Sequence, residues 1–484
     1  MPINLRDSTG DKMPTFDSEQ EKLEFIFTCK GKGLSPDQMA RGSDLLFIRS
    51  QDLLAVYHQK GSGRVLSAWE ALQAFGVDLL YEAVVDGSAI LVSTKEEPAR
   101  TIARRRKDLG LSNADIAKYT RLSLEDIHNL EDPKRRNPIQ HLEIMARCLG
   151  LDERRIGFKP GSGGDNQLAI RLRNLKSSSS HFTPGTVMKF NEAAWTIATQ
   201  YRLTSWLNAG EKPFWETNFE ADNTYGDASY PAWQRGYYLA GQTRRILGIG
   251  HDEPILNLRE LCNKKLEIPL LQMPLSKDIA GATLANNDDR GIVVNILGSN
   301  NNVWIRRSTI AHELGHLLWD PEQNLNRLKV DHYEDFDRDP EYFLRSHDFV
   351  EMRANAFSAE LLAPRDASVE EFKRTDLRHV MEKFGVSFSI ARYQVWNGLK
   401  RVIHWDSLVV DDILATDDWV GRESFTVDYF RPESVPTSRK GLFAFLVVKS
   451  ESANLISEDT AINYLGCSAT EYHQYKDLIF DIFQ

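Results

Sequence analysis

Two histidines four residues apart, inside a largely apolar run, constrain this chain more than any other feature. The run is STIAHELGHLLWD, residues 308–320. On an α-helix, residues four apart share one face, so His312 and His316 can direct their imidazoles at a single ion. Glu313 lies about 100° around the helix axis, where it can reach a water without binding the ion itself. The pattern predicts a helix that supplies two metal ligands and a general base.

Chance is the competing explanation for this motif. Three specified residues at ordinary frequencies occur in roughly one or two chains in a hundred of this length. The context strengthens the metal interpretation, because Ile310, Leu314 and Leu317 make the helix apolar and buried histidines need polar partners. Zinc held by three protein ligands keeps one position open for catalysis, which fits a hydrolytic site.

The third ligand is expected on a second helix, predicted in FVEMRANAFSAELLAP, residues 349–364. Glu351 is the favoured ligand, and Asn355, one turn later, is favoured to orient a ligand by a hydrogen bond. Trp319 and Glu322 occupy the positions where metzincins have glycine and histidine, which excludes that class. The rival ligands are Asp320, Glu322, His332, His347 and Glu360.

A second feature is residues 98–158, where Lys and Arg outnumber Asp and Glu although the whole chain has a net charge of −10. The succession of short helical signals resembles an XRE/Cro-type helix-turn-helix, and the resemblance implies residues 113–120 as the first helix of the motif and 123–131 as the recognition helix. Acidic residues on the recognition helix oppose binding to the phosphates of DNA, so a protein is an alternative to DNA as the partner of this unit. The candidate DNA contacts are Arg121, His128, Asn129, Lys134, Arg135 and Arg136.

Separated blocks between residues 231 and 400 resemble the ImmA/IrrE family of metallopeptidases. They include RRSTIAHELGHLLWD, EMRANAFSAELLAP and FGVSFSIARYQVWNGL. The resemblance implies a compact α/β zinc peptidase fold and a helix-turn-helix repressor as protein substrate. Its motif residues map onto His312, Glu313, His316, Glu351 and Asn355.

Two further features bear on this resemblance. The 34 residues between His316 and Glu351 form a long acidic insertion, which departs from the family pattern and could shield the site. Residues 98–158 resemble an XRE/Cro-type helix-turn-helix, with Arg121 at a turn position that often holds glycine.

The predicted fold class is multidomain, mainly α with α/β parts: an XRE-like all-α helix-turn-helix and a zincin-like α/β metallopeptidase domain. Residues 442–450, LFAFLVVKS, read as a strand, and 291–295, GIVVN, read either as an edge strand for substrate or as a plain core strand. FGVSFSIARYQVWNGL is expected to pack on the peptidase core. The predicted domains are 1–96 (α/β, role unknown), 97–160 (helix-turn-helix), 161–181 (linker), 182–400 (metallopeptidase) and 401–484 (role unknown).

The sequence also limits the location of the protein. The N-terminus lacks the apolar core of a signal peptide, and no apolar run approaches the ~18 residues that span a bilayer. The four cysteines show no CxxC spacing, which argues against a disulfide framework or a cysteine zinc site. A cytoplasmic protein without a membrane partner is expected, and a homodimer stays open.

Two functions remain. The favoured one is a Zn²⁺-dependent endopeptidase that cleaves a regulatory, repressor-like protein in a stress, mobile-element or defence response. The alternative is a DNA-binding transcriptional regulator or antitoxin-like repressor, whose zinc domain acts as a sensor or scaffold. The enzyme is favoured because the sequence contains the candidate ligands as well as the general base Glu313. The predicted helix-turn-helix on the same chain keeps double-stranded DNA as a candidate partner.

Overall fold

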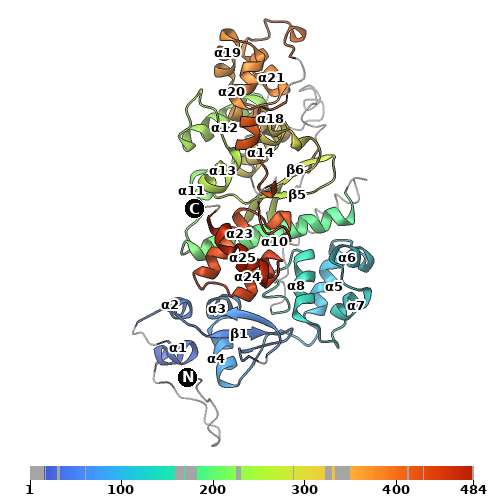
Figure 1. Cartoon of the computed structure of the whole chain (residues 1–484), viewed down its shortest axis with the longest axis vertical. Helices are drawn as coiled ribbons and strands as arrows, with labels where there is room; N and C mark the ends of the chain where they lie inside the picture. The colour runs from blue at the N-terminus through green and yellow to red at the C-terminus, as the bar shows by residue number, and fades with distance from the viewer. Residues whose placement is uncertain are drawn as a thin grey trace, which may run out of the picture.

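The computed structural model places an N-terminal α/β unit at one end of an elongated molecule and α19–α21 at the other (Figure 1). Within the described part of the chain, no helix combines the length and apolarity that crossing a membrane requires. The described residues are 16, 18–29, 33–59, 61–158, 168, 182–224, 230–286, 288–321, 330–332, 349–410, 414–428 and 430–481.

The N-terminal unit is built on a small antiparallel sheet with strand order β3-β1-β2-β4. Capping boxes at Ser35 and Ser67 begin two of its helices by satisfying backbone N–H groups that have no partner within the helix. Its elements are α1 (Glu19–Phe27), α2 (Pro36–Arg41), β1 (Leu46–Arg49), β2 (Leu53–Val56), β3 (Arg64–Ser67), α3 (Ala68–Phe75), α4 (Val77–Val85) and β4 (Ala89–Ile90).

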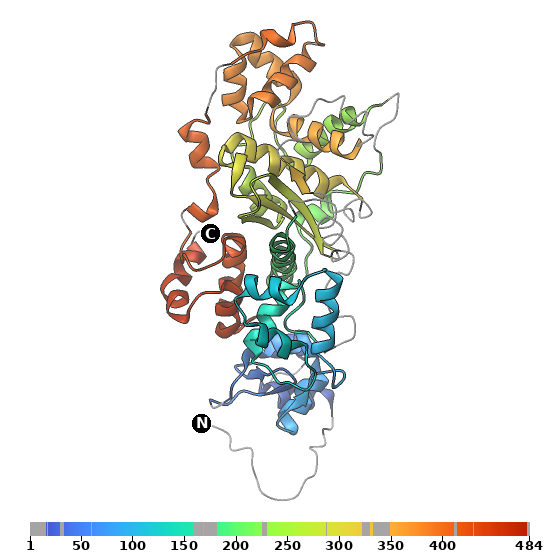
Figure 2. The ribbon, with the colours of Figure 1, turned by 90° about the vertical axis from the view of Figure 1, so that its right-hand side faces the viewer.

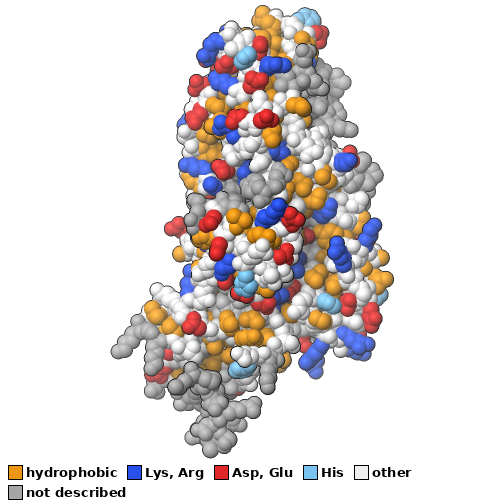
Figure 3. Space-filling view, in the orientation of Figure 1, with side chains coloured by type: hydrophobic (Ala, Val, Ile, Leu, Met, Phe, Trp, Pro, Cys, Tyr) orange, Lys and Arg blue, Asp and Glu red, His pale blue; other side chains and the backbone are white. Residues whose placement is uncertain are grey.

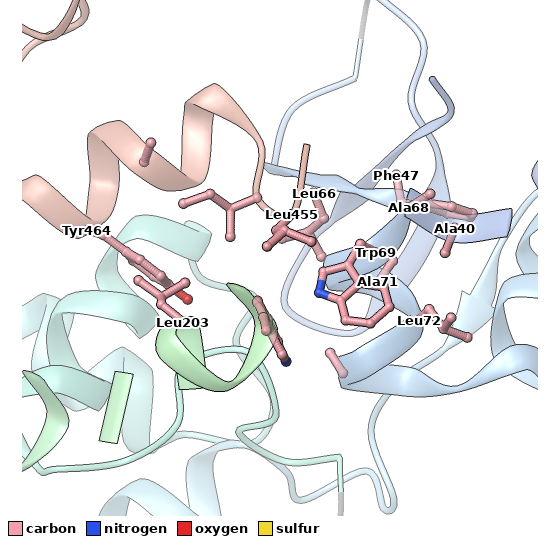
Figure 4. Close-up of a cluster of buried hydrophobic side chains, with 14 of the residues drawn as sticks. Ala40, Phe47, Leu66, Ala68, Trp69, Ala71, Leu72, Leu203, Leu455 and Tyr464 are labelled. Carbon is pink, nitrogen blue, oxygen red and sulfur yellow. The ribbon is translucent and has the colours of Figure 1, made fainter. Parts of the chain in front are cut away.

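The C-terminal helices pack against this N-terminal unit, although more than 350 residues separate them in sequence. Figure 4 shows the shared core, in which Trp69 and Leu66 lie near Leu203, Leu455 and Tyr464. The helices are α23 (Leu442–Ser452), α24 (Glu458–Leu465) and α25 (Ala469–Asp481).

The strand predicted at residues 442–450 is wrong, because this segment forms helix α23. Most of the helix is buried, including Phe443, Leu446 and Val447. A helix buried on most of its sides carries a nearly continuous apolar run, and periodicity alone cannot distinguish such a run from a core strand.

Four short helices follow the N-terminal unit, and two of them lie where the sequence predicts the helix-turn-helix. Ser112 and Ser123 each cap a helix through a capping box. Arg121 ends the first of these helices in the left-handed conformation, with φ of 64°. The four helices are α5 (Ala99–Asp108), α6 (Asn113–Thr120), α7 (Leu124–Glu131) and α8 (Ile139–Cys148).

Helix α10 (Pro184–Leu207) joins the parts of the molecule. Figure 2 looks along this helix and shows it between α5–α8, the C-terminal helices and a second sheet. One continuous hydrophobic core contains side chains from α5–α8, α10 and this second sheet, so α5–α8, the predicted helix-turn-helix unit, are packed onto the rest of the chain.

The second sheet has the order β5-β7-β6-β8, with β5 parallel to β7 and the other pairs antiparallel. Val293 packs with α10, whereas Ile292 and Val294 belong to the core on the opposite face. Strand β7 therefore lies inside the sheet, which excludes the edge-strand reading of GIVVN and leaves that of a core strand. The strands are β5 (Leu270–Met273), β6 (Ile279–Asn286), β7 (Asp289–Asn295) and β8 (Val330–His332).

The face of the sheet away from α10 is covered by a helical layer. Gly236 lets two of these helices approach closely, because a Cβ there would lie 2.3 Å from the carbonyl oxygen of Arg353. The larger helices are α12 (Ala232–Leu247), α14 (Val303–Trp319), α18 (Phe349–Leu362), α19 (Arg365–Arg374), α20 (Leu377–Phe384) and α21 (Phe388–Gly398). The shorter helical pieces, not all of which belong to this layer, are α11 (Phe214–Asn218), α13 (Leu258–Glu260), η1 (Leu261–Leu266), η2 (Gly298–Asn301), η3 (Trp405–Ser407), α22 (Asp417–Arg422), η4 (Thr426–Asp428) and η5 (Thr437–Arg439).

The segment FGVSFSIARYQVWNGL packs, as predicted, on the core that contains α14. Val386, Ala391 and Val395 are buried in the same hydrophobic cluster as Leu314 and Leu317 of α14.

Candidate metal centre

Two helices bring three potential metal ligands together. Helix α14 carries His312 and His316 one turn apart, and α18 presents Glu351 to both. The two Nε2 atoms of the histidines lie 3.0 Å apart, and the Glu351 carboxylate oxygens lie 3.3 Å from that of His312 and 3.5 Å from that of His316. All three residues are buried, and among the described residues they form the one group that could hold a metal ion.

The spacing of these atoms fits zinc. Tetrahedral zinc with ligand distances of about 2.0–2.1 Å separates neighbouring ligand atoms by about 3.3 Å. The observed separations of 3.0, 3.3 and 3.5 Å bracket this value. Two imidazoles and one carboxylate also form the ligand set of many catalytic zinc sites.

Asp320 orients His316 from behind. Its Oδ2 lies 2.8 Å from Nδ1 of His316, which leaves Nε2 facing His312 and Glu351. A carboxylate on the far nitrogen is the usual partner of a zinc-binding histidine, because it fixes the ring and strengthens the ligand. Asp320 was a rival ligand in the sequence, and the structure places it behind the ligand instead.

Strong charge coupling accompanies this geometry. Burial alone would lower the pKa of His316, but the carboxylates of Asp320 and Glu351 hold that pKa well above its usual value. Burial alone would raise the pKa of Glu351, and the neighbouring histidines, His316 above all, bring that pKa well below its usual value instead.

Arg353 ties the two ligand-bearing helices together. It lies on α18, two residues after Glu351, and its guanidinium forms a buried ion pair with Asp320 at the end of α14. The same side chain donates to the carbonyl oxygens of Asp222, at 2.8 Å, and Thr224, at 3.1 Å. Arg353 therefore fixes the position of the third ligand relative to the first two.

Glu313 is held beside the cluster by the sheet. Thr283 of β6 donates a hydrogen bond of 2.7 Å to Oε2 of Glu313. Gly281 of the same strand makes room for the carboxylate, because a Cβ there would lie 3.3 Å from Oε1 of Glu313. The carboxylate is thus buried next to His312 and oriented by a neutral donor, as suits a general base.

The other residues considered from the sequence lie elsewhere. Asn355 is partly buried one turn after Glu351, and it makes no hydrogen bond to the three candidate ligands, all of which are described, so its orienting role stays a prediction. Glu360 accepts hydrogen bonds from Gln394 and from the backbone of Arg365, away from the cluster. The backbone of His332 lies in β8, whereas its side chain, together with Glu322 and His347, lies outside the described part.

The predicted DNA contacts are arranged differently. Arg121, His128, Lys134, Arg135 and Arg136 are exposed, and Asn129 is partly buried. Figure 3 shows Lys and Arg side chains on the right-hand side of the molecule, where Figure 1 places α5–α7. Arg136 lies 3.3 Å from Asp52 of the N-terminal unit, and Leu124 at the start of α7 is also exposed.

Three supporting residues complete the site, and two of them, Thr283 and Arg353, carry no motif that would have identified their roles. Thr283 lies 30 residues before Glu313 on a separate strand. Arg353 stands between Glu351 and Asn355, and its position in the sequence gave no sign of its role. Asp320 could have been found, because it stands four residues after His316, at the same spacing as the two histidines.

Comparison with known proteins supports the metal-binding part of the chain. The Peptidase_M78 family model, described as an IrrE N-terminal-like domain, matches residues 296–395. The matched segment contains the two histidines, Glu313 and Glu351, and it supports a metallopeptidase-like domain here. A search of curated proteins finds no match to the chain. The helix-turn-helix unit lies outside the matched segment, so its XRE/Cro resemblance stays a prediction.

Proposed function

We propose that this chain is a zinc-dependent endopeptidase that cleaves a regulatory, repressor-like protein. The observation that carries the proposal is the convergence of His312, His316 and Glu351 from two helices, at separations that suit zinc. The match of this segment to a peptidase family supports the same conclusion.

Each residue of the site has a distinct role in this proposal. His312, His316 and Glu351 hold the ion, while Asp320 orients one of the imidazoles. Bound zinc supplies a Lewis acid that polarises the scissile carbonyl and makes water a better nucleophile near neutral pH. Glu313 accepts a proton from the attacking water and later delivers it to the leaving amine.

The helix-turn-helix unit would recognise double-stranded DNA through Arg121, His128, Asn129, Lys134, Arg135 and Arg136. Exposure of the basic residues among them supports this role. The acidic side chains of α7 support the other candidate partner, a protein of related fold such as the substrate or a second copy of the chain. We keep the stress, mobile-element or defence setting as part of the proposal.

Substitution of Glu313 by Gln tests the peptidase activity. Purified wild type and Glu313→Gln, with equal zinc content, are incubated with a library of denatured cellular peptides, and new N-termini are counted by mass spectrometry. Loss of the general base should slow cleavage about 10²- to 10⁴-fold. Glu360→Gln is the matched control, because it makes the same change on α18 outside the cluster. Equal cleavage by wild type and Glu313→Gln would contradict the proposal.

The second candidate function is a DNA-binding regulator that does not cleave proteins. The exposed basic residues on the same chain favour it. Repression of a reporter gene discriminates the two, because Glu313→Gln leaves repression intact only if cleavage is not required.

A further inference from the structure

A polar pocket lies where the helix-turn-helix unit, α10 and the peptidase sheet meet. Its volume is about 580 Å³, within the range of sites that hold small molecules. One wall is a face of α10 that includes Trp195, Ala198 and Arg202. The other walls come from residues 150–152 after α8, residues 210–213 with Glu216 of α11, and Asp289 at the start of β7.

The charged groups in the wall do not balance. Asp152 pairs with Arg154 at 2.8 Å and with Arg202 at 3.8 Å, and Arg202 also pairs with Glu153 at 3.8 Å. Glu216 pairs with Lys212 at 3.5 Å, so the charges of these groups balance. Glu211 and Asp289 also line the pocket, and neither has an ion-pair partner among the described residues. The pocket therefore keeps an excess of negative charge.

Of the two carboxylates, Asp289 is the stronger indication of a cationic ligand, because it is partly buried. Burial is the main reason that its pKa is raised, to about 7; the attraction of Arg202 opposes the rise, and the neighbouring carboxylates of Asp288 and Glu216 add to it. A positive group of a ligand beside Asp289 would replace the missing counter-charge.

We propose that this pocket binds a small organic cation bearing amino groups. A metal ion fits less well, because the one described group with three converging metal-ligand atoms lies elsewhere, at His312, His316 and Glu351. An apolar ligand would leave the carboxylates of Glu211 and Asp289 in the pocket wall without a counter-charge. An amine satisfies the carboxylates and donates to the remaining acceptors.

The pocket is also connected to the helix that carries the two histidines. The hydroxyl of Tyr201, in the pocket wall, donates a hydrogen bond of 3.0 Å to the carbonyl oxygen of Arg290. The guanidinium of Arg290 donates in turn to the carbonyl oxygen of Leu317, next to His316, at 3.3 Å. The proposal concerns binding only and does not depend on the proposed peptidase activity.

Calorimetric titration of the full chain with spermidine tests the proposal. Wild type should bind it, and Asp289→Asn should bind it at least about 10-fold more weakly, because the counter-charge is lost. Asp288→Asn is the matched control, since it removes an equal charge from an exposed neighbour outside the pocket wall, and it should change affinity less than about 3-fold. Similar losses in both variants would overturn the proposal, because they would indicate binding to diffuse surface charge.

Two further measurements use the same titration. Wild-type affinity for spermidine should rise between pH 6 and pH 8 as Asp289 ionises, whereas the affinity of Asp289→Asn should stay nearly constant. Ala198→Phe should abolish binding by filling the pocket without changing its charge. No binding of spermidine by wild type, unchanged binding by Ala198→Phe, or equal binding of citrate would each overturn the proposal.

Discussion

The sequence predicts functional side chains on two pairs of helices, α14–α18 and α6–α7. The structure buries these side chains in the first pair and leaves most of them exposed in the second. In the first pair the functional groups are buried and converge, and each is held by a neighbour. In the second pair Arg121 and His128 project into solvent.

The difference shows how far structure constrains function in each region. A buried polar group costs stability unless it is satisfied, so its neighbours narrow what it can bind. The ligand atoms of His312, His316 and Glu351 all lie within 4.8 Å of one another, close enough to share one ion. Exposed groups carry no such constraint, which is why α7 is compatible with DNA or with a protein partner.

The largest expected effect is the loss of a ligand. Glu351→Ala should weaken zinc binding at least about 100-fold, because two histidines alone cannot complete the site. Competition with a chromogenic chelator measures the affinity, with Glu360→Ala on the same helix as control. Comparable affinities of the two variants would place the metal elsewhere.

Removal of the carboxylate behind His316 should have a smaller effect. Asp320→Asn keeps a hydrogen-bond acceptor but loses the charge that orients and strengthens the ligand, so zinc affinity should fall about 10- to 100-fold. The same competition assay measures it, and the circular dichroism spectrum should stay unchanged. Full zinc affinity in this variant would show that Asp320 only stabilises the fold.

The exposed basic residues of the predicted helix-turn-helix unit allow a test of DNA binding. If Lys134, Arg135 and Arg136 contact phosphates, replacing all three by Ala should lower the slope of log affinity against log salt by roughly 2 to 3. Fluorescence anisotropy with duplex DNA measures the slope, and a double Ala replacement of Lys373 and Arg374, both exposed on α19, is the control. An unchanged slope would favour a protein partner.

The smallest effect concerns Glu70, a buried carboxylate outside both regions. It accepts hydrogen bonds from the backbone of Ser67 and Ser457, yet burial raises its pKa to about 7. The folded state therefore holds its proton more tightly than the unfolded state, so stability falls as pH rises from about 4.5 to about 7. Glu70→Gln should raise Tm at pH 8 by about 2–4 °C and leave it nearly unchanged at pH 4.5. An equal shift at both pH values would contradict this sign.

Local patterns explain what the sequence could predict. Helical spacing was sufficient for His312, Glu313 and His316. The predicted range 113–120 coincides with α6, and the predicted range 123–131 begins at Ser123, the residue that caps α7. Other residues that complete the metal centre could not be predicted from the sequence. Thr283 and Arg353 reach the site through tertiary packing, which leaves no characteristic spacing in the sequence.

Long-range packing explains the errors. The apolar run of α23 was read as a strand because a helix buried on most sides has no polar face to reveal its period. Helix α23 belongs to the same hydrophobic cluster as Trp69 and Leu66, which are far away in the sequence, and such packing carries no local signal. The interior position of β7 likewise depends on its pairing with both β5 and β6.

Anomalous diffraction at the zinc edge, from crystals of the purified chain, tests the central claim most directly. The account predicts one strong peak within about 2.0–2.2 Å of Nε2 of His312, Nε2 of His316 and the carboxylate of Glu351. No peak after zinc is supplied, or a peak bound by other residues, would contradict the account and favour the DNA- or protein-binding regulator.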